Sequence, residues 1–244
     1  MISLGTTHIA STCTESQDLR HMFPDKLLMW LRNSRQYNGG GIASVTETRW
    51  DDVSGRDNHC TIEAEDSQPA VDLGGLHMDG SNDYMDFSST IEFATETPFC
   101  IIMVVDLDGN SNEVITSDGV NEFIEILTIT KLRIKTEGTG SGNIISAFTA
   151  GTNTWLTTEG KIILTITRAT TGELNIYKNG AVVAGTWSNQ TNAGAIQLQN
   201  LGCRNDADRF FDGKMYEFAI ISEEVNDTKL EMMHDYYKKI FNIS

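Results

Sequence analysis

Oxygen-rich loops give the chain its first candidate chemistry, because carboxylate and amide oxygens are the ligands that calcium takes in proteins. Asp106-Leu107-Asp108-Gly109-Asn110 spaces such oxygens at alternate positions, but an EF-hand would continue with Gly and Glu where this chain has Ser111 and Ser117. The alternative is an Asx-type turn, in which the side chain caps its own backbone. Calcium is the candidate cofactor, and its expected ligands are Asp79, Asn82, Asp83, Asp106, Asp108, Asp206 and Asp208.

Three aromatic residues in loop-like contexts could bind a glycan. Tyr37, Trp155 and Trp187 are each surrounded by Gly, Asn, Thr or Ser. An exposed aromatic ring on a loop can stack on the face of a sugar, whereas a ring that folds back caps the hydrophobic core instead. These three residues are therefore our predicted glycan-binding residues, with core capping as the alternative.

Nucleophilic and metal-dependent catalytic motifs are absent from the sequence. It contains no G-x-S-x-G, no H-E-x-x-H and no P-loop. The histidines are far apart, at His8, His21, His59, His77 and His234. The four cysteines, Cys13, Cys60, Cys100 and Cys203, form no C-x-x-C pair, and Cys100 lies in an apolar run where we expect a buried thiol. We expect no catalytic residue.

The charge of the chain argues against two classes of partner. Its 244 residues include 34 acidic and 18 basic ones, for a net charge of −16. Such a balance disfavours nucleic acid and anionic membrane surfaces. The N-terminus lacks a basic region followed by an apolar core, and no stretch reaches the roughly 18 apolar residues that span a bilayer. We expect synthesis in a reducing cytoplasm and no membrane insertion.

Short strands separated by turns must position any site in this chain. Phe99 to Leu107 is almost entirely apolar, as in a central strand buried on both faces. Asn179-Gly180 predicts a two-residue type I′ hairpin, because both residues tolerate positive φ. The last segment carries apolar residues at helical spacing, namely Leu230, Met233, Tyr237, Ile240 and Phe241. The pattern predicts an all-β fold, an antiparallel two-sheet jelly-roll sandwich with a short C-terminal helix.

Five segments between roughly residues 25 and 241 follow one another as short motifs, namely Leu28–Leu31, Trp50–His59 with W-x-D-x-S-G-x-x-N-H, Gly75–Met85, Ile176–Gly180 and Phe211–Phe218. In kind and order they resemble landmarks of the concanavalin A-like lectin/glucanase superfamily, in particular its laminin-G-like jelly-roll domains. The resemblance implies a domain over residues 25–244, preceded by an N-terminal arm or edge segment over residues 1–24. Enzymes of the superfamily carry E-x-D-x-x-E, which places carboxylates on one strand face. The nearest matches in this chain, Glu63-x-Glu65 and Glu122-x-x-Glu125, each lack one carboxylate.

The resemblance leaves three functions open, because this fold hosts lectins, glycosidases and structural modules. Our first expectation is a non-enzymatic virion surface protein, a bacteriophage capsid decoration, fibre or knob subunit, with a structural and host-glycan adhesive role. Its partners would be other virion proteins, further copies of itself, or a cell-surface glycan. The alternatives are a soluble, calcium-dependent carbohydrate-binding lectin, cytoplasmic or extracellular, and a divergent glycoside hydrolase.

Overall fold

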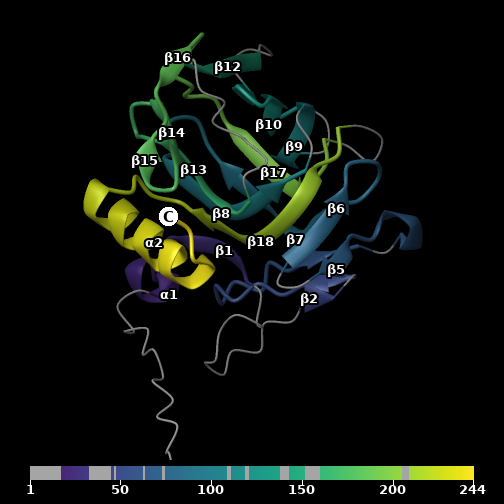
Figure 1. The fold of residues 1–244 in the computed structure, drawn as a ribbon. Coiled ribbons are helices and arrows are strands. Elements are labelled where there is room, and N and C mark those ends of the chain that lie inside the picture. Colours follow the sequence, from purple (N-terminus) through teal and green to yellow (C-terminus); the bar gives the residue numbers. More distant parts are fainter. Residues whose placement is uncertain are drawn as a thin grey trace, which may run out of the picture.

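The chain folds into two antiparallel β-sheets packed face to face, with a helix beneath one of them (Figure 1). The structure is a computed structural model, and it describes residues 18–32, 45–46, 48–62, 64–72, 75–108, 111–118, 121–137, 143–151, 160–204 and 209–244. Within these ranges no helix is long and apolar enough to cross a membrane. The predicted all-β sandwich with a C-terminal helix is confirmed.

The first sheet has eight strands among the described residues, and β8 and β18 lie at its centre. β1 pairs with β18 beside the main path of the sheet. In spatial order the path runs through β15 (Ala181–Val182), β14 (Leu174–Lys178), β13 (Ile162–Arg168), β8 (Phe99–Leu107), β18 (Asp212–Ile221), β6 (Gly75–Asp79) and β5 (Ala70–Asp72), with β1 spanning Leu27–Arg32.

The second sheet has ten strands in the described part of the chain. Its order is β16 (Gly185–Trp187), β12 (Asn143–Ala150), β11 (Lys131–Glu137), β10 (Phe123–Thr128), β9 (Ser111–Ser117), β17 (Ile196–Leu201), β7 (Met85–Phe93), β4 (Cys60–Thr61), β3 (Arg49–Trp50) and β2 (Val45–Thr46). The turn at Asp79-Gly80 connects the two sheets, because β6 belongs to the first and β7 to the second.

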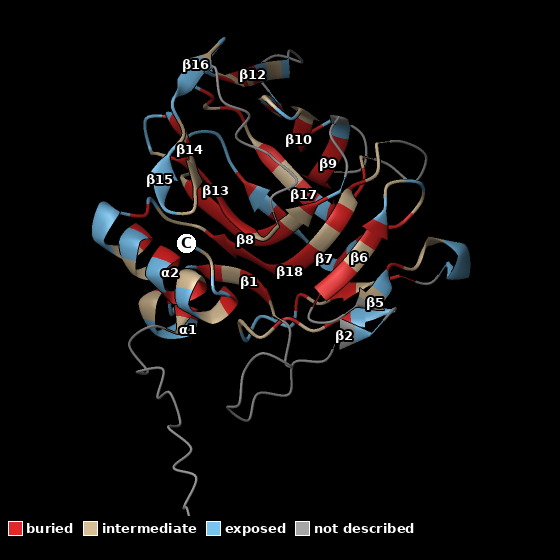
Figure 2. Ribbon diagram, viewed as in Figure 1, coloured by how far each residue is buried: buried red, intermediate tan, exposed pale blue. Residues whose placement is uncertain are grey.

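Strand β8 separates two hydrophobic cores, since successive side chains of a strand point to opposite faces. Phe99, Ile101 and Met103 belong to the main core between the sheets. Cys100 and Ile102 belong to a second core on the other face. The prediction of a central strand buried on both faces is confirmed, and Figure 2 shows β8 and β18 in the colour of buried residues.

Helix α2 (Asp227–Phe241) covers the second core, with Leu230, Met233 and Tyr237 buried as the spacing predicted. It begins at Asn226, whose side-chain oxygen accepts the backbone N–H of Lys229 at 3.0 Å. The short helix α1 (Leu19–Met22), which the sequence patterns did not predict, contributes to the same core.

The N-terminal limit of the domain has a consequence for any truncation. Leu19 and Phe23 are buried in the second core, although they fall within the predicted arm over residues 1–24. Residues 1–17 lie outside the described residues. The boundary of the arm stays a prediction, and a variant designed to test it must retain residue 18 onward to keep this core intact.

Candidate functional site

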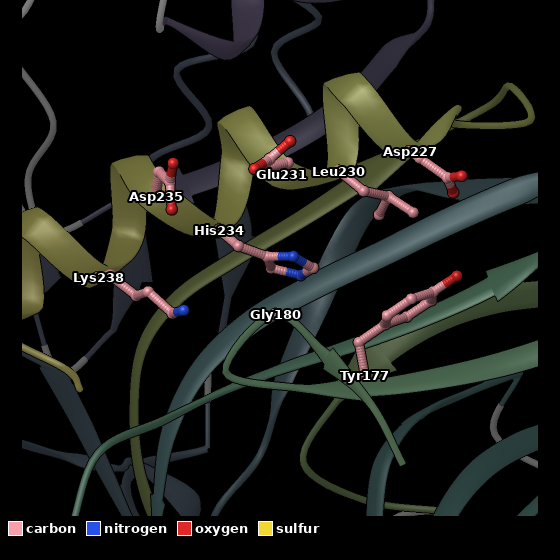
Figure 3. A pocket seen from close by; sticks show the side chains of 8 residues that line it. All are labelled: Tyr177, Gly180, Asp227, Leu230, Glu231, His234, Asp235 and Lys238. Atoms are coloured by element: carbon pink, nitrogen blue, oxygen red, sulfur yellow. The ribbon is translucent and has the colours of Figure 1, made fainter. Parts of the chain in front are cut away.

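A pocket of about 370 Å³ lies between α2 and the hairpin formed by β14 and β15 (Figure 3). The hairpin contributes Tyr177 and Gly180. The helix contributes six residues at one-turn spacings, namely Asp227, Leu230, Glu231, His234, Asp235 and Lys238. Residues four apart lie above one another on a helix, so Leu230, His234 and Lys238 form one row facing the hairpin.

The hairpin has the geometry that its sequence predicted. Asn179 and Gly180 have φ values of 49° and 85°, as a type I′ turn requires. A Cβ at position 180 would lie 3.3 Å from the Cβ of His234, closer than most side-chain contacts. Gly180 therefore serves both the turn and the close approach of the hairpin to the helix.

His234 forms the floor of the pocket and stays neutral near pH 7. Its side chain is buried, and its Nε2 lies 2.9 Å from the Oγ1 of Thr165 on β13. The pKa of His234 is lowered to about 4, chiefly by burial and also by the ammonium of Lys238, against an opposing effect of Asp235. The ring is thus a neutral hydrogen-bonding group.

Tyr177 forms the opposite wall with a half-buried ring. The centroid of this ring lies 5.9 Å from that of His234. Burial raises the pKa of Tyr177, and the carboxylate of Asp227 raises it further, so the phenol keeps its proton. An apolar ring face with a hydroxyl at its end offers a ligand both a stacking surface and a hydrogen-bonding group.

The pocket combines a ring surface with hydrogen-bonding groups of both signs, the composition expected of a small-ligand site. Asp227, Glu231 and Asp235 supply exposed carboxylate acceptors, and Lys238 supplies a half-buried ammonium donor. Within the described ranges no group of three or more His, Cys, Asp or Glu side chains is arranged to hold a metal ion. The groups that line the pocket can stack on a polar ligand and hydrogen-bond it.

Of the three predicted glycan-binding residues, the structure describes Trp187. Trp187 lies on β16, where its ring packs against Phe148 with centroids 5.1 Å apart and contacts the main core. This position corresponds to the capping alternative. Tyr37 and Trp155 lie outside the described residues, so their role stays a prediction.

The predicted calcium ligands Asp79, Asn82 and Asp83 belong to the turn that joins β6 to β7. The Oδ1 of Asp79 accepts the backbone N–H groups of Ser81, at 2.8 Å, and of Asn82, at 3.3 Å. The buried Asp83 accepts the N–H of Asp79 at 2.9 Å through its Oδ2. Burial raises the pKa of Asp83. These oxygens cap the backbone of the turn, which is the alternative that the sequence left open.

Of the remaining predicted ligands, the structure describes Asp106 and Asp108. Asp106 is half-buried within β8, and the Oδ2 of the exposed Asp108 lies 3.4 Å from the Nε2 of His77. Asp206 and Asp208 lie outside the described residues. Calcium binding at these loops stays a prediction.

The carboxylates closest to a hydrolase motif have other partners. Glu125 is fully buried and pairs with Arg133 through one oxygen and with Arg209 through the other. Glu122 accepts the backbone N–H of Gln197, and burial raises its pKa. Glu63 lies outside the described residues. Glu125 therefore acts as a structural ion-pair partner within the second sheet.

The Trp50–His59 motif forms a hydrogen-bond network centred on the carboxylate of Asp52. Its Oδ1 accepts the backbone N–H of Trp30 at 2.8 Å, and its Oδ2 accepts the hydroxyl of Ser54 at 2.7 Å and the N–H of Asn58 at 3.0 Å. The side chain of Asn58 in turn accepts the N–H of Ser89 on β7 at 2.9 Å. The polar residues of this motif tie β1 of one sheet to β7 of the other.

Sequence patterns pointed to both walls of the pocket without showing that they meet. The Tyr-x-Asn-Gly hairpin is a landmark of the fold, and the apolar spacing of the last segment predicts a helix packed on the sandwich. The polar face of α2 carries Asp227, Glu231 and Asp235 at intervals of four, which was the available signal.

Comparison with solved structures finds the same fold in toxin binding domains. The binding domain of Paraclostridial Mosquitocidal Protein 1 has a TM-score of 0.59 and 17% identity, covering 87% of this chain and 52% of that one. A botulinum neurotoxin type C structure, whose cell entry is described as dependent on two ganglioside molecules, has a TM-score of 0.57 and 12% identity, with 88% and 52% covered. Trypanosoma rangeli sialidase has a TM-score of 0.58 and 12% identity, with 88% and 33% covered.

These likenesses establish a lectin-like β-sandwich fold. The chain spans about half the length of the toxin domains that it matches. No protein-family model matches the sequence, and no curated protein is similar to it at a significant level. Membership of the concanavalin A-like superfamily stays a prediction from the sequence motifs.

Proposed function

We propose that this protein is a non-enzymatic, lectin-like binding module that recognises a carbohydrate in the pocket between α2 and the β14–β15 hairpin. The observation that carries the proposal is the half-buried ring of Tyr177, which lies across a pocket of about 370 Å³ from Asp227 and His234 of α2. Sugars present apolar ring faces and many hydroxyls, so an aromatic wall beside carboxylate acceptors suits them.

The comparisons support a binding role in a coarser way. Structures with this fold include toxin domains described as binding domains, and one of the toxins is described as depending on gangliosides for cell entry. A sialidase shares the fold as well. The pairing of Glu125 with Arg133 and Arg209 supports a binding module over a glycosidase, because both carboxylate oxygens are occupied.

A glycan array with matched variants tests this proposal. Tyr177→Ala removes the stacking surface, whereas Tyr177→Phe keeps the ring and serves as the control. We expect the wild type and Tyr177→Phe to bind the same glycans, and Tyr177→Ala to lose about tenfold or more in affinity. Silence of the wild type across the array, or full binding by Tyr177→Ala, would contradict the proposal. A polysaccharide panel with detection of reducing ends tests the glycoside hydrolase alternative.

We further propose that the module acts on the surface of a bacteriophage particle, as a decoration, fibre or knob subunit. Its support is the acidic net charge, the resemblance to lectin-like jelly-roll domains, the lack of a known catalytic motif in the sequence and the predicted N-terminal arm. Deletion of residues 1–17 removes most of the predicted arm over residues 1–24 and spares Leu19 and Phe23, which belong to the second core. The deleted form should fold, as judged by thermal denaturation, and should fail to co-sediment with particles. Undiminished decoration by the deleted form would refute the arm as the attachment element.

A soluble, calcium-dependent lectin is the alternative setting. Repeating the array with a chelator distinguishes it, because a calcium-dependent site would lose its glycans when the ion is removed. The α2 pocket itself should bind equally well with and without chelator, since its described side chains supply ring and hydrogen-bonding surfaces rather than a metal site.

A further inference from the structure

We propose that the pocket between α2 and the β14–β15 hairpin selects sugars that carry a protonated amino group, such as non-acetylated hexosamine units, over sialylated or sulfated sugars. This inference rests on the proposed carbohydrate-binding function and adds the chemical class of the ligand. It is carried by the charges around the cavity together with its aromatic wall and neutral floor.

The helix side of the pocket presents more negative than positive charge. Asp227, Glu231 and Asp235 contribute three carboxylates, and Lys238 contributes one ammonium. The three carboxylates stand one helical turn apart, so they follow the length of the pocket as a row. The four groups together leave two negative charges beside any bound ligand.

Among the described residues, the other groups that line the pocket add no compensating charge. The phenol of Tyr177 keeps its proton, and Gly180 has no side chain. His234 is buried beneath the cavity against the hydroxyl of Thr165 and is neutral above its pKa of about 4. The hairpin side of the pocket is thus uncharged, and the helix carboxylates set the sign of its potential.

The position of Tyr177 places a stacked sugar next to these carboxylates. Its ring lies across the cavity from the helix, and Asp227 is close enough to raise the pKa of its hydroxyl. A sugar stacked on this ring would direct its ring substituents toward the helix. A protonated amine there gains charge-assisted hydrogen bonds, whereas a carboxylate or sulfate meets repulsion.

Exposure of the carboxylates sets the size of the effect. Asp227, Glu231 and Asp235 are all exposed, so solvent and salt screen them. An exposed pair of opposite charges contributes only a modest interaction free energy. Two or three of these carboxylates acting on one amine should make an amino sugar bind about tenfold more tightly than its acetylated form at low salt. This difference in affinity should shrink at high salt.

Titration calorimetry on the intact chain tests the inference with three probes at mildly acidic pH, where the sugar amine is protonated. The probes are a glucosamine tetramer, the corresponding N-acetylglucosamine tetramer, and sialyllactose. We expect the glucosamine tetramer to bind about tenfold more tightly than its acetylated counterpart at low salt. Sialyllactose should bind more weakly than both.

A charge-neutralising variant identifies the residues responsible. Glu231→Gln with Asp235→Asn keeps the shape of the pocket and removes two charges, so the preference for the amine should fall about threefold to tenfold while affinity for the acetylated tetramer is retained. The matched control, Glu65→Gln with Glu92→Gln, removes two exposed charges outside the pocket and should leave the preference unchanged.

The outcomes separate this inference from the proposed function. Equal affinity for the two tetramers, or a preference for sialyllactose that Tyr177→Ala abolishes, would overturn the inference and leave carbohydrate binding in place. An amine preference that the control variant loses as fully as the pocket variant would also overturn it. Absence of binding to all three probes and to every glycan on the array would remove the proposed function, and the inference with it.

Discussion

His234 should make the fold sensitive to mild acid. Its pKa is 6.5 in an ordinary setting and about 4 in the fold, so the unfolded chain binds the proton first as the pH falls. The free energy of unfolding therefore rises with pH through this window. The stability that the neutral His234 contributes is lost as the pH drops from about 6.5 toward 4. The full shift corresponds to about 3 kcal/mol, of which about 2 kcal/mol is lost by pH ~5.

Urea denaturation at neutral and mildly acidic pH measures this effect, with His234→Gln as the non-titrating variant. Gln can still hydrogen-bond Thr165, and the quantity of interest is the loss of stability on acidification in each protein. The wild type should lose about 2 kcal/mol more than His234→Gln between pH ~7 and ~5. The subtraction removes other groups that titrate in both proteins.

A second histidine variant guards against a general effect of removing an imidazole. His21 is exposed on α1, so the variant His21→Gln should show the same loss of stability on acidification as the wild type. Equal loss of stability in the wild type and His234→Gln would refute the reasoning, because it would mean that the buried imidazole takes up its proton as readily in the folded chain as in the unfolded one.

Three further substitutions probe the stability of the fold. Arg168 is buried and donates to the carbonyls of Thr97 and Gly194, so Arg168→Met should lower the free energy of unfolding by about 3 kcal/mol, measured by urea denaturation. Asp52→Asn replaces a carboxylate that accepts several buried hydrogen bonds and should lower the free energy of unfolding by about 2 kcal/mol in the same assay. An unchanged midpoint would contradict a stabilising role for this hydrogen-bond network. Gly180→Ala places a side chain at φ +85° and should lower the melting temperature by several degrees, corresponding to about 1 kcal/mol, whereas a higher melting temperature would count against the turn geometry.

Elements of the fold that depend on local patterns were predictable. β8 was recognised from its continuous apolar run, and α2 from apolar residues at helical spacing. The Asn179-Gly180 turn followed from the backbone angles that these two residues tolerate. Each signal lies within a few residues, so no knowledge of distant contacts was needed.

The partners of the polar residues were not predictable in the same way. Trp187 could either stack on a ligand or cap the core, and its contact with Phe148 depends on the pairing of β16 with β12. Asp79 could either bind an ion or cap a turn, and its oxygen accepts two backbone N–H groups. A side chain with two plausible roles takes the one that its three-dimensional neighbours allow.

The sequence by itself determined the fold class, the central strand, the hairpin and the C-terminal helix, because periodicity and turn chemistry act over short stretches. The tertiary structure alone decided where the candidate pocket lies. Tyr177 and His234 are 57 positions apart in the chain (234 − 177), and they meet because α2 packs over the second core beside β13 and the hairpin. That packing arises from the burial of apolar side chains, which fixes the helix on the sheet. The polar residues of α2 that line the pocket are thereby placed next to the ring of Tyr177.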